Sequence, residues 1–83
     1  MNYDSQLIKK ILLEIKKNPK QKEKEINIPG FNYDDIVFPH LKYLWEEKFI
    51  SAKPGKDESG EIVSLIVYDL SPKGEKYLKT LNT

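Results

Sequence analysis

Residues 40–50 read HLKYLWEEKFI, and this stretch decides the fold of the chain. Leu41, Leu44 and Lys48 recur at the spacing that brings side chains to one side of a helix. Val37 extends the same stripe one turn toward the N-terminus. The stretch then ends in two apolar residues that continue into a β-prone segment. The pattern therefore predicts a helix that leads directly into a strand.

This helix is expected to begin at a good N-cap and to contain a proline. Asn32 is the N-cap, and Asp34 and Asp35 follow in the first turn, where the helix dipole favours negative charge. We expect one helix over residues 33–48 with a kink at Pro39, because a proline inside a helix removes a hydrogen bond. The alternative is a separate short helix over residues 33–37, with Pro39 as the first residue of the next helix.

The segment after the helix predicts a β-hairpin. The first strand covers residues 50–53, the turn-rich tip PGKDESG covers residues 54–60, and the second strand covers residues 62–68. One face of the second strand holds Val63, Leu65 and Val67, and the other holds Ile62, Ser64, Ile66 and Tyr68. A strand that is apolar on both faces is either central in its sheet or partly covered by a partner.

Another helix is predicted toward the N-terminus. Asp4 or Ser5 can cap it, and its apolar stripe spans residues 7–15. Asn18 followed by Pro19 ends the helix, because the residue before a proline avoids the helical conformation. The lysines of this helix either contact phosphates or form an ordinary solvated face. A charged loop follows over residues 20–25.

Two shorter signals complete the predicted elements. Residues 26–28 alternate as a brief strand, which Pro29 and Gly30 close. Ser71 is expected to cap the last helix, with Pro72 at its first position. The side chains that pack this helix inward are Tyr77, Leu78 and Leu81.

The order of these motifs resembles the winged helix-turn-helix superfamily of the ArsR, MarR and PadR types. Residues 37–50, VFPHLKYLWEEKFI, are similar to its recognition-helix consensus V-S-R-H-L-K-x-L-x-x-x-G-L-V, and residues 70–78, LSPKGEKYL, are similar to L-T-x-K-G-x-x-x-L. The chain most resembles small uncharacterised winged-helix proteins of Gram-positive bacteria and their phages, including the YjcQ type. It departs from the consensus where Lys48 replaces a glycine and where Phe38 and Pro39 replace the polar pair.

The resemblance implies a single α+β winged-helix domain over residues 1–83. Its three helices would accompany a small antiparallel sheet that includes a two-stranded wing, with residues 26–28 pairing to the wing. The function implied is that of a DNA-binding or transcription-regulatory protein of phage or prophage type. The candidate DNA contacts are Asn32, His40, Lys42, Tyr43, Lys53 and Lys56.

The residue types on the helix argue for an alternative function. Opposite its apolar stripe lie Asp35, Pro39, Lys42, Tyr43 and Glu46, of which Lys42 alone is basic. Direct reading of bases should therefore be poor, and His40 can equally be a packing residue. The alternative is a winged-helix protein-interaction module, with Phe38, Pro39 and Tyr43 as its partner patch. A homodimer is a further expectation.

Composition limits the remaining possibilities. The formal net charge is +1, and it is unevenly spread: seven lysines face four acids in residues 1–25, whereas four lysines face eight acids in residues 26–69. The chain has no cysteine and one histidine, and its glycines are scattered. We therefore expect neither an enzyme nor a bound cofactor or metal. With no apolar run near the roughly 20 residues of a membrane span, a cytoplasmic protein is expected.

Overall fold

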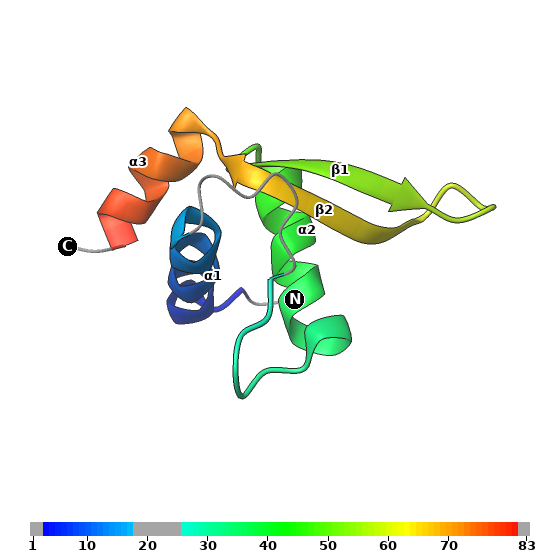
Figure 1. Ribbon diagram of the computed structural model, residues 1–83, viewed down its shortest axis with the longest axis horizontal. Coiled ribbons are helices and arrows are strands. Elements are labelled where there is room, and N and C mark those ends of the chain that lie inside the picture. Colours follow the sequence, from blue (N-terminus) through cyan, green and yellow to red (C-terminus); the bar gives the residue numbers. More distant parts are fainter. Residues whose placement is uncertain (1–2, 18–25, 82–83) are drawn as a thin grey trace.

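Three α-helices and a two-stranded antiparallel sheet form the part of the chain that the computed structural model describes, residues 3–17 and 26–81. This is an α+β arrangement compatible with a winged helix, as predicted. The elements, in order, are α1 (Ser5–Lys17), the π-helical turn η1 (Tyr33–Val37), α2 (Phe38–Glu46), β1 (Ile50–Lys56), β2 (Ile62–Leu70) and α3 (Pro72–Leu81). Figure 1 shows the β-hairpin projecting from the helices, with α1 and α3 on the side away from its tip.

Every described element contributes side chains to one apolar core. The helix α1 contributes an unbroken stripe of five buried residues, in agreement with its predicted pattern. The buried apolar residues are Leu7, Ile8, Ile11, Leu12, Ile15, Ile26, Ile28, Val37, Leu41, Leu44, Ile50, Leu65, Val67, Leu70 and Leu78. Removal of this surface from water is the main force that holds α1, α2 and the sheet together.

The N-terminal cap of α1 is one of the two residues that the sequence predicted. Asp4 is the cap, because its Oδ1 accepts hydrogen bonds from the backbone N–H of Gln6 at 2.8 Å and of Leu7 at 3.4 Å. The predicted helix end at Asn18 and Pro19 and the loop over residues 20–25 lie outside the described residues.

The predicted strand at residues 26–28 is wrong. Ile26 and Ile28 are buried and Asn27 is exposed, so the predicted alternation is present. The described part of the sheet nevertheless contains β1 and β2 alone. The backbone turns immediately after Ile28, whose carbonyl accepts from the N–H of Phe31 at 3.2 Å. The segment thus anchors to the core through its side chains and not through a ladder of backbone hydrogen bonds.

The helix around Pro39 follows one continuous path, but its first turn is π-helical. The N–H groups of Val37 and Phe38 bond to carbonyls five residues earlier, at Asn32 and Tyr33. Val37 and Phe38 both have right-handed helical dihedrals, so no separate turn divides η1 from α2. A proline ring normally clashes with the carbonyl four residues before it. The wider π turn accommodates Pro39 in the first turn of α2.

The helix ends at Glu46, two residues earlier than predicted, in a Schellman motif. The N–H of Phe49 bonds to the Leu44 carbonyl at 2.9 Å, and the N–H of Lys48 bonds to the Trp45 carbonyl at 3.0 Å. Lys48 has a φ of 63°, in the left-handed region where the related consensus has glycine. Lys48 is therefore exposed beyond the helix end, and its predicted place in the apolar stripe is wrong.

The hairpin has longer strands than predicted. The strand β1 continues through Pro54 and Gly55, which were expected in the tip, and the turn covers residues 57–60. The register slips between Ser51 and Ala52 and between Gly55 and Lys56, and in each case β2 contains one extra residue. The extra residue near the tip is Val63, so the bulge rotates it out of the face of Leu65 and Val67. Val63 is consequently exposed, contrary to its predicted position.

The helix α3 begins as predicted and lies against the end of α2. Ser71 caps it by accepting from the N–H of Gly74 at 3.0 Å, and the Ser71 hydroxyl donates to the Lys48 carbonyl at 2.6 Å. Gly74 packs directly on the backbone of Phe49, where a Cβ would overlap the carbonyl group. Leu78 is buried, and Tyr77 and Leu81 are partly buried, in agreement with the predicted inward face.

We expect Lys48→Gly to raise the free energy of unfolding by about 0.5–1 kcal/mol, because glycine adopts the left-handed conformation without the cost that a Cβ imposes. Urea denaturation would measure the change. The control is Glu47→Gly, at a position with φ of −82°, which should instead lower the free energy of unfolding. Equal losses of unfolding free energy in the two variants would contradict the left-handed conformation assigned to Lys48.

We expect Gly74→Ala to lower the free energy of unfolding by about 2–3 kcal/mol or more, because the added methyl group meets the Phe49 backbone, which cannot move aside as a flexible side chain could. Thermal and urea denaturation would both report the loss. Lys76→Ala, on the exposed face of the same helix, is the matched control and should change stability by less than about 0.5 kcal/mol.

Candidate nucleic-acid and partner surfaces

The outward face of α2 is acidic. Glu46 is exposed at the end of α2 and Asp35 is exposed in η1, and Pro39 and Lys42 are half-buried between them. One lysine between two carboxylates is a poor surface for a phosphate backbone, because like charges repel. The expected composition of this face is therefore present, and two candidate DNA contacts, Lys42 and Tyr43, lie on it.

His40 is part of the packing between α1 and α2. The ring is 3% exposed, and its Nε2 accepts from the backbone N–H of Asp4 at 3.1 Å. Its Nδ1 lies 2.7 Å from the Ile36 carbonyl oxygen, which can only accept, so the tautomer protonated on Nδ1 fits both partners. The ring has no nitrogen left for a base or a phosphate.

Tyr43 is covered on one side by the N-terminal segment. Its ring stacks on that of Tyr3, with centroids 4.1 Å apart and planes inclined by 20°. Burial is the main cause that raises the pKa of the Tyr43 hydroxyl above its ordinary value of 10.0, and Tyr77 and Glu47 add to it. Tyr43 therefore helps to attach the residues before α1, and one face of its ring is covered by Tyr3.

Asn32, another candidate DNA contact, is the N-cap of η1. The Asn32 side chain is exposed, and its Oδ1 accepts from the N–H of Asp35 at 2.9 Å. This is the predicted N-cap bond. A side-chain amide that caps a helix retains its NH₂ group for another partner, but its position is set by the cap.

The wing tip carries its two lysines beside three acids. Lys53 and Lys56 are exposed on β1, whereas Asp57 and two glutamates, Glu58 and Glu61, follow at the turn. The Asp57 carboxylate holds the turn, because its Oδ1 accepts from the Ser59 hydroxyl at 2.6 Å, the Ser59 N–H at 2.9 Å and the Glu61 N–H at 3.0 Å. The hydrogen bond from the Ser59 hydroxyl is the main cause that lowers the pKa of Asp57 below 3.8. The tip is thus an ordered turn with a net negative charge.

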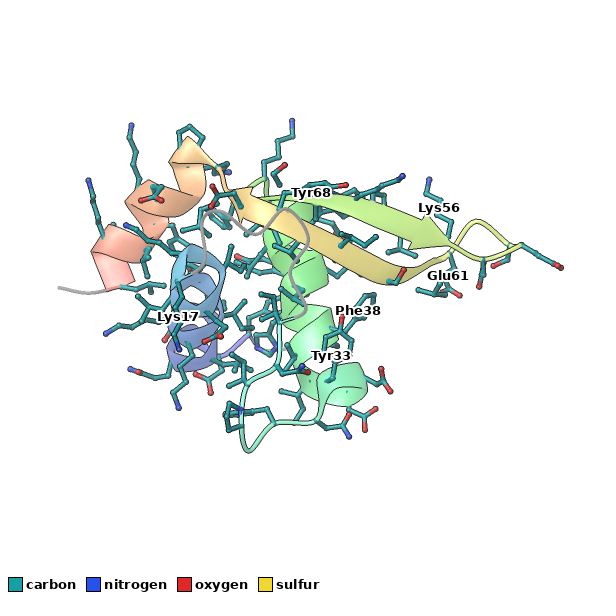
Figure 2. The ribbon with its side chains drawn as sticks, viewed as in Figure 1. Lys17, Tyr33, Phe38, Lys56, Glu61 and Tyr68 are labelled. Carbon is teal, nitrogen blue, oxygen red and sulfur yellow. The ribbon has the colours of Figure 1, made fainter. Side chains whose placement is uncertain are left out.

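The predicted partner patch is not assembled as one surface. Phe38 lies 6.2 Å from Tyr33 between ring centroids, and Figure 2 shows both below the hairpin. Tyr43 belongs to a different set, with Tyr3 at 4.1 Å and Phe49 at 6.5 Å between ring centroids. In α2, Phe38 and Tyr43 are five residues apart and point about 140° away from each other.

The helices α1 and α3 together present a basic surface, which we call the lysine face. The two helices pack against each other and are joined by an ion pair between Lys16 and Glu75, with Nζ and Oε2 3.1 Å apart. The lysines of this face are Lys9, Lys10, Lys16, Lys17, Lys73, Lys76 and Lys79. In Figure 2, Lys17 projects from α1 on the side away from the wing. Sequence reasoning identified the lysines of α1 as possible phosphate contacts, but not that α1 packs beside the lysine-bearing helix α3.

Charge is strongly segregated between the two sides of the molecule. The helices α1 and α3 hold seven lysines and two glutamates, a formal charge of +5. Residues 33–70, which form η1, α2 and the hairpin, hold four lysines and eight acids, a formal charge of −4. An anionic ligand is therefore attracted to the lysine face and repelled from the face that a winged-helix protein would present to DNA.

Two other kinds of site find no support in the structure. Within residues 3–17 and 26–81, no three histidine, aspartate or glutamate side chains gather as metal ligands. No helix in those ranges is long and apolar enough to cross a membrane.

Comparison with known proteins places the whole chain in one family. The family model described as "Hypothetical protein (DUF2513)" matches residues 2–83. Searches of the curated proteins and of the solved structures found no match.

We expect Ser59→Ala to raise the pKa of Asp57 toward 3.8, because the variant removes the hydroxyl that stabilises the carboxylate. Carboxyl chemical shifts followed by NMR between about pH 2 and 6 would measure the change. Because the folded pKa is lowered, the contribution of Asp57 to stability is present above pH 3.8 and is lost as pH falls through the folded pKa. Ser64→Ala is the control and should leave the titration unchanged.

Proposed function

We propose that this chain, which belongs to the DUF2513 family, is a small cytoplasmic DNA-binding protein of the winged-helix type that holds duplex DNA through its lysine face. One observation carries the proposal: α1 and α3, which pack against each other, together hold seven lysines and two glutamates. Lysines that approach phosphates release the counterions condensed on DNA, and this release supplies most of non-specific binding.

The chemistry of the lysine face favours contacts with the phosphate backbone over reading of bases. The chain contains no arginine, which is the usual bidentate partner of guanine. Leu13 is the large apolar side chain most exposed on α1, at 44%, and it offers no aromatic ring for a base to stack on. The lysine ammonium group is a point charge on a flexible side chain, and it contacts phosphates without regard to the base sequence of the DNA. The ligand expected is therefore double-stranded DNA, bound with little dependence on sequence.

Three of the lysines are already engaged and should contribute less. The Lys10 ammonium lies 5.7 Å from the centre of the Phe31 ring. Lys16 pairs with Glu75, and the Lys73 ammonium donates to the Glu47 carbonyl at 2.9 Å and lies 4.8 Å from the centre of the Phe49 ring. Lys9, Lys17, Lys76 and Lys79 are the better phosphate contacts, and they come from both helices.

Binding of a labelled DNA duplex, titrated at several salt concentrations, tests the proposal. We expect the logarithm of the association constant to fall linearly with the logarithm of salt concentration, and the fourfold variant Lys9→Gln, Lys17→Gln, Lys76→Gln, Lys79→Gln to lose about 0.9 in slope for each contact removed. The control variant, Lys42→Gln with Lys53→Gln and Lys56→Gln, should keep the wild-type slope.

Several results would overturn this function. Absence of binding at about 50 mM salt would exclude it, and so would loss of binding in the control variant alone, since DNA would then lie on α2 and the wing. Preference for one duplex sequence by more than about a hundredfold would show base reading that the lysine face does not provide. Vesicles of anionic lipid that bind while DNA does not would assign the face to a membrane surface.

A second function, a protein-interaction module, is favoured by the acidic face of α2 and by apolar side chains left exposed on the sheet. Asp35 and Glu46 repel nucleic acid from that face, and Val63 and Ile66 are 56% and 38% exposed on β2. The two functions use opposite sides of the molecule and are compatible with each other.

A further inference from the structure

Within residues 3–17 and 26–81, the edge of β2 away from β1 lacks the usual protection. Among the described residues, β1 is the strand that pairs with β2, and it does so along one side. The sequence IVSLIVY over residues 62–68 contains no charged residue and no proline. An edge of this kind offers unpaired N–H and carbonyl groups to another strand.

The opposite edge of the sheet, on β1, is protected. It carries Lys53 and Lys56, both exposed, and Pro54 between them has no N–H to donate. Edge lysines and prolines are the devices that keep other strands away. The contrast between the two strands indicates that pairing is blocked at β1 and, as far as the described residues show, left open at β2.

Exposed apolar side chains accompany the open edge. Val63 and Ile66 are 56% and 38% exposed, and Val63 owes its position to the bulge in β2. These are the exposed large apolar residues of the sheet in the described part of the chain. An added strand could cover them with its own apolar side chains while its backbone extends the ladder.

Acidic residues at the two ends of residues 62–68 limit which strand can pair with β2. Glu61 precedes the stretch and Asp69 follows it, and both are exposed. Figure 2 places Glu61 at the far end of the hairpin and Tyr68 near its base. Antiparallel pairing of β2 with a second copy would bring the Glu61 end of each strand toward the Asp69 end of the other. Like charges facing each other oppose that arrangement.

We infer that the outer edge of β2 binds an extended peptide segment that has alternating apolar side chains and basic residues at its ends. The segment would add a third strand beside residues 62–68, cover Val63 and Ile66, and place its basic ends near Glu61 and Asp69. This inference deepens the second of the two functions proposed above and does not depend on DNA binding.

Two synthetic peptides test the inference with the full chain. The capped peptide KVTVTVK carries the proposed pattern, and EVTVTVE differs in its end charges alone. We expect KVTVTVK to bind about tenfold or more tightly than EVTVTVE at low salt, and to lose this advantage at about 1 M salt. Backbone amide shifts in ¹H–¹⁵N NMR spectra should change most along residues 62–68.

Surface variants locate the binding edge. Ile66→Thr together with Val63→Thr keeps β-branched side chains at exposed positions, so the fold should persist, and the affinity for KVTVTVK should fall about fivefold or more. Lys53→Thr is the matched control on β1 and should leave the affinity unchanged.

Three outcomes would overturn the inference. Equal binding of the two peptides would remove the role of Glu61 and Asp69, and amide shifts centred on β1 would place the site on the other edge. A doubling of molecular mass in sedimentation experiments, abolished by the Ile66→Thr and Val63→Thr variant, would assign the edge to a second copy of the chain. None of these outcomes depends on the lysine face, so DNA binding can fail or succeed independently.

Discussion

The close approach of α3 to the end of α2 is the constraint on which the rest of this structure depends. Lys48 turns the chain through a left-handed conformation, and Phe49 then offers its carbonyl to the N–H of Ser71 at 3.0 Å. Gly74 rests on the same backbone because it has no Cβ. This junction sets where β1 leaves α2 and where α3 begins. It therefore sets the direction of the hairpin and brings α3 beside α1.

The functional consequence of this junction is the separation of charge. Since α3 turns back onto α1, its three lysines join those of α1, and the acids of α2 and the hairpin remain on the other side. A second contact, between Asp4 and His40 at 3.1 Å, fixes the start of α1 to α2 and uses a side chain that could otherwise have faced a ligand. Electrostatic steering acts over the whole surface, so the arrangement of helices decides which face an anion meets.

Much of the fold and part of the candidate site could be predicted from the sequence. The stripe of α1, the Asn32 cap, the Ser71 cap and the acidic outward face of α2 all follow from local spacing and capping preferences. The bulge at Val63 could not be predicted, because a single extra residue in one strand is defined only by its partner strand. The burial of His40 likewise depends on Asp4, which is 36 residues away in the chain.

The sequence by itself determined where the three helices and the hairpin lie, which residues are apolar enough to form the core, and that charge is unevenly distributed along the chain. These properties depend on near neighbours in the chain. The tertiary structure alone decided that α1 packs against α3, so that their lysines lie on neighbouring helices, that Tyr3 stacks on Tyr43, and that β1 is the strand paired with β2 among the described residues. The reason is physical: each of these features requires segments distant in sequence to meet, and the meeting is set by the packing of one core and by the backbone contact between Gly74 and Phe49.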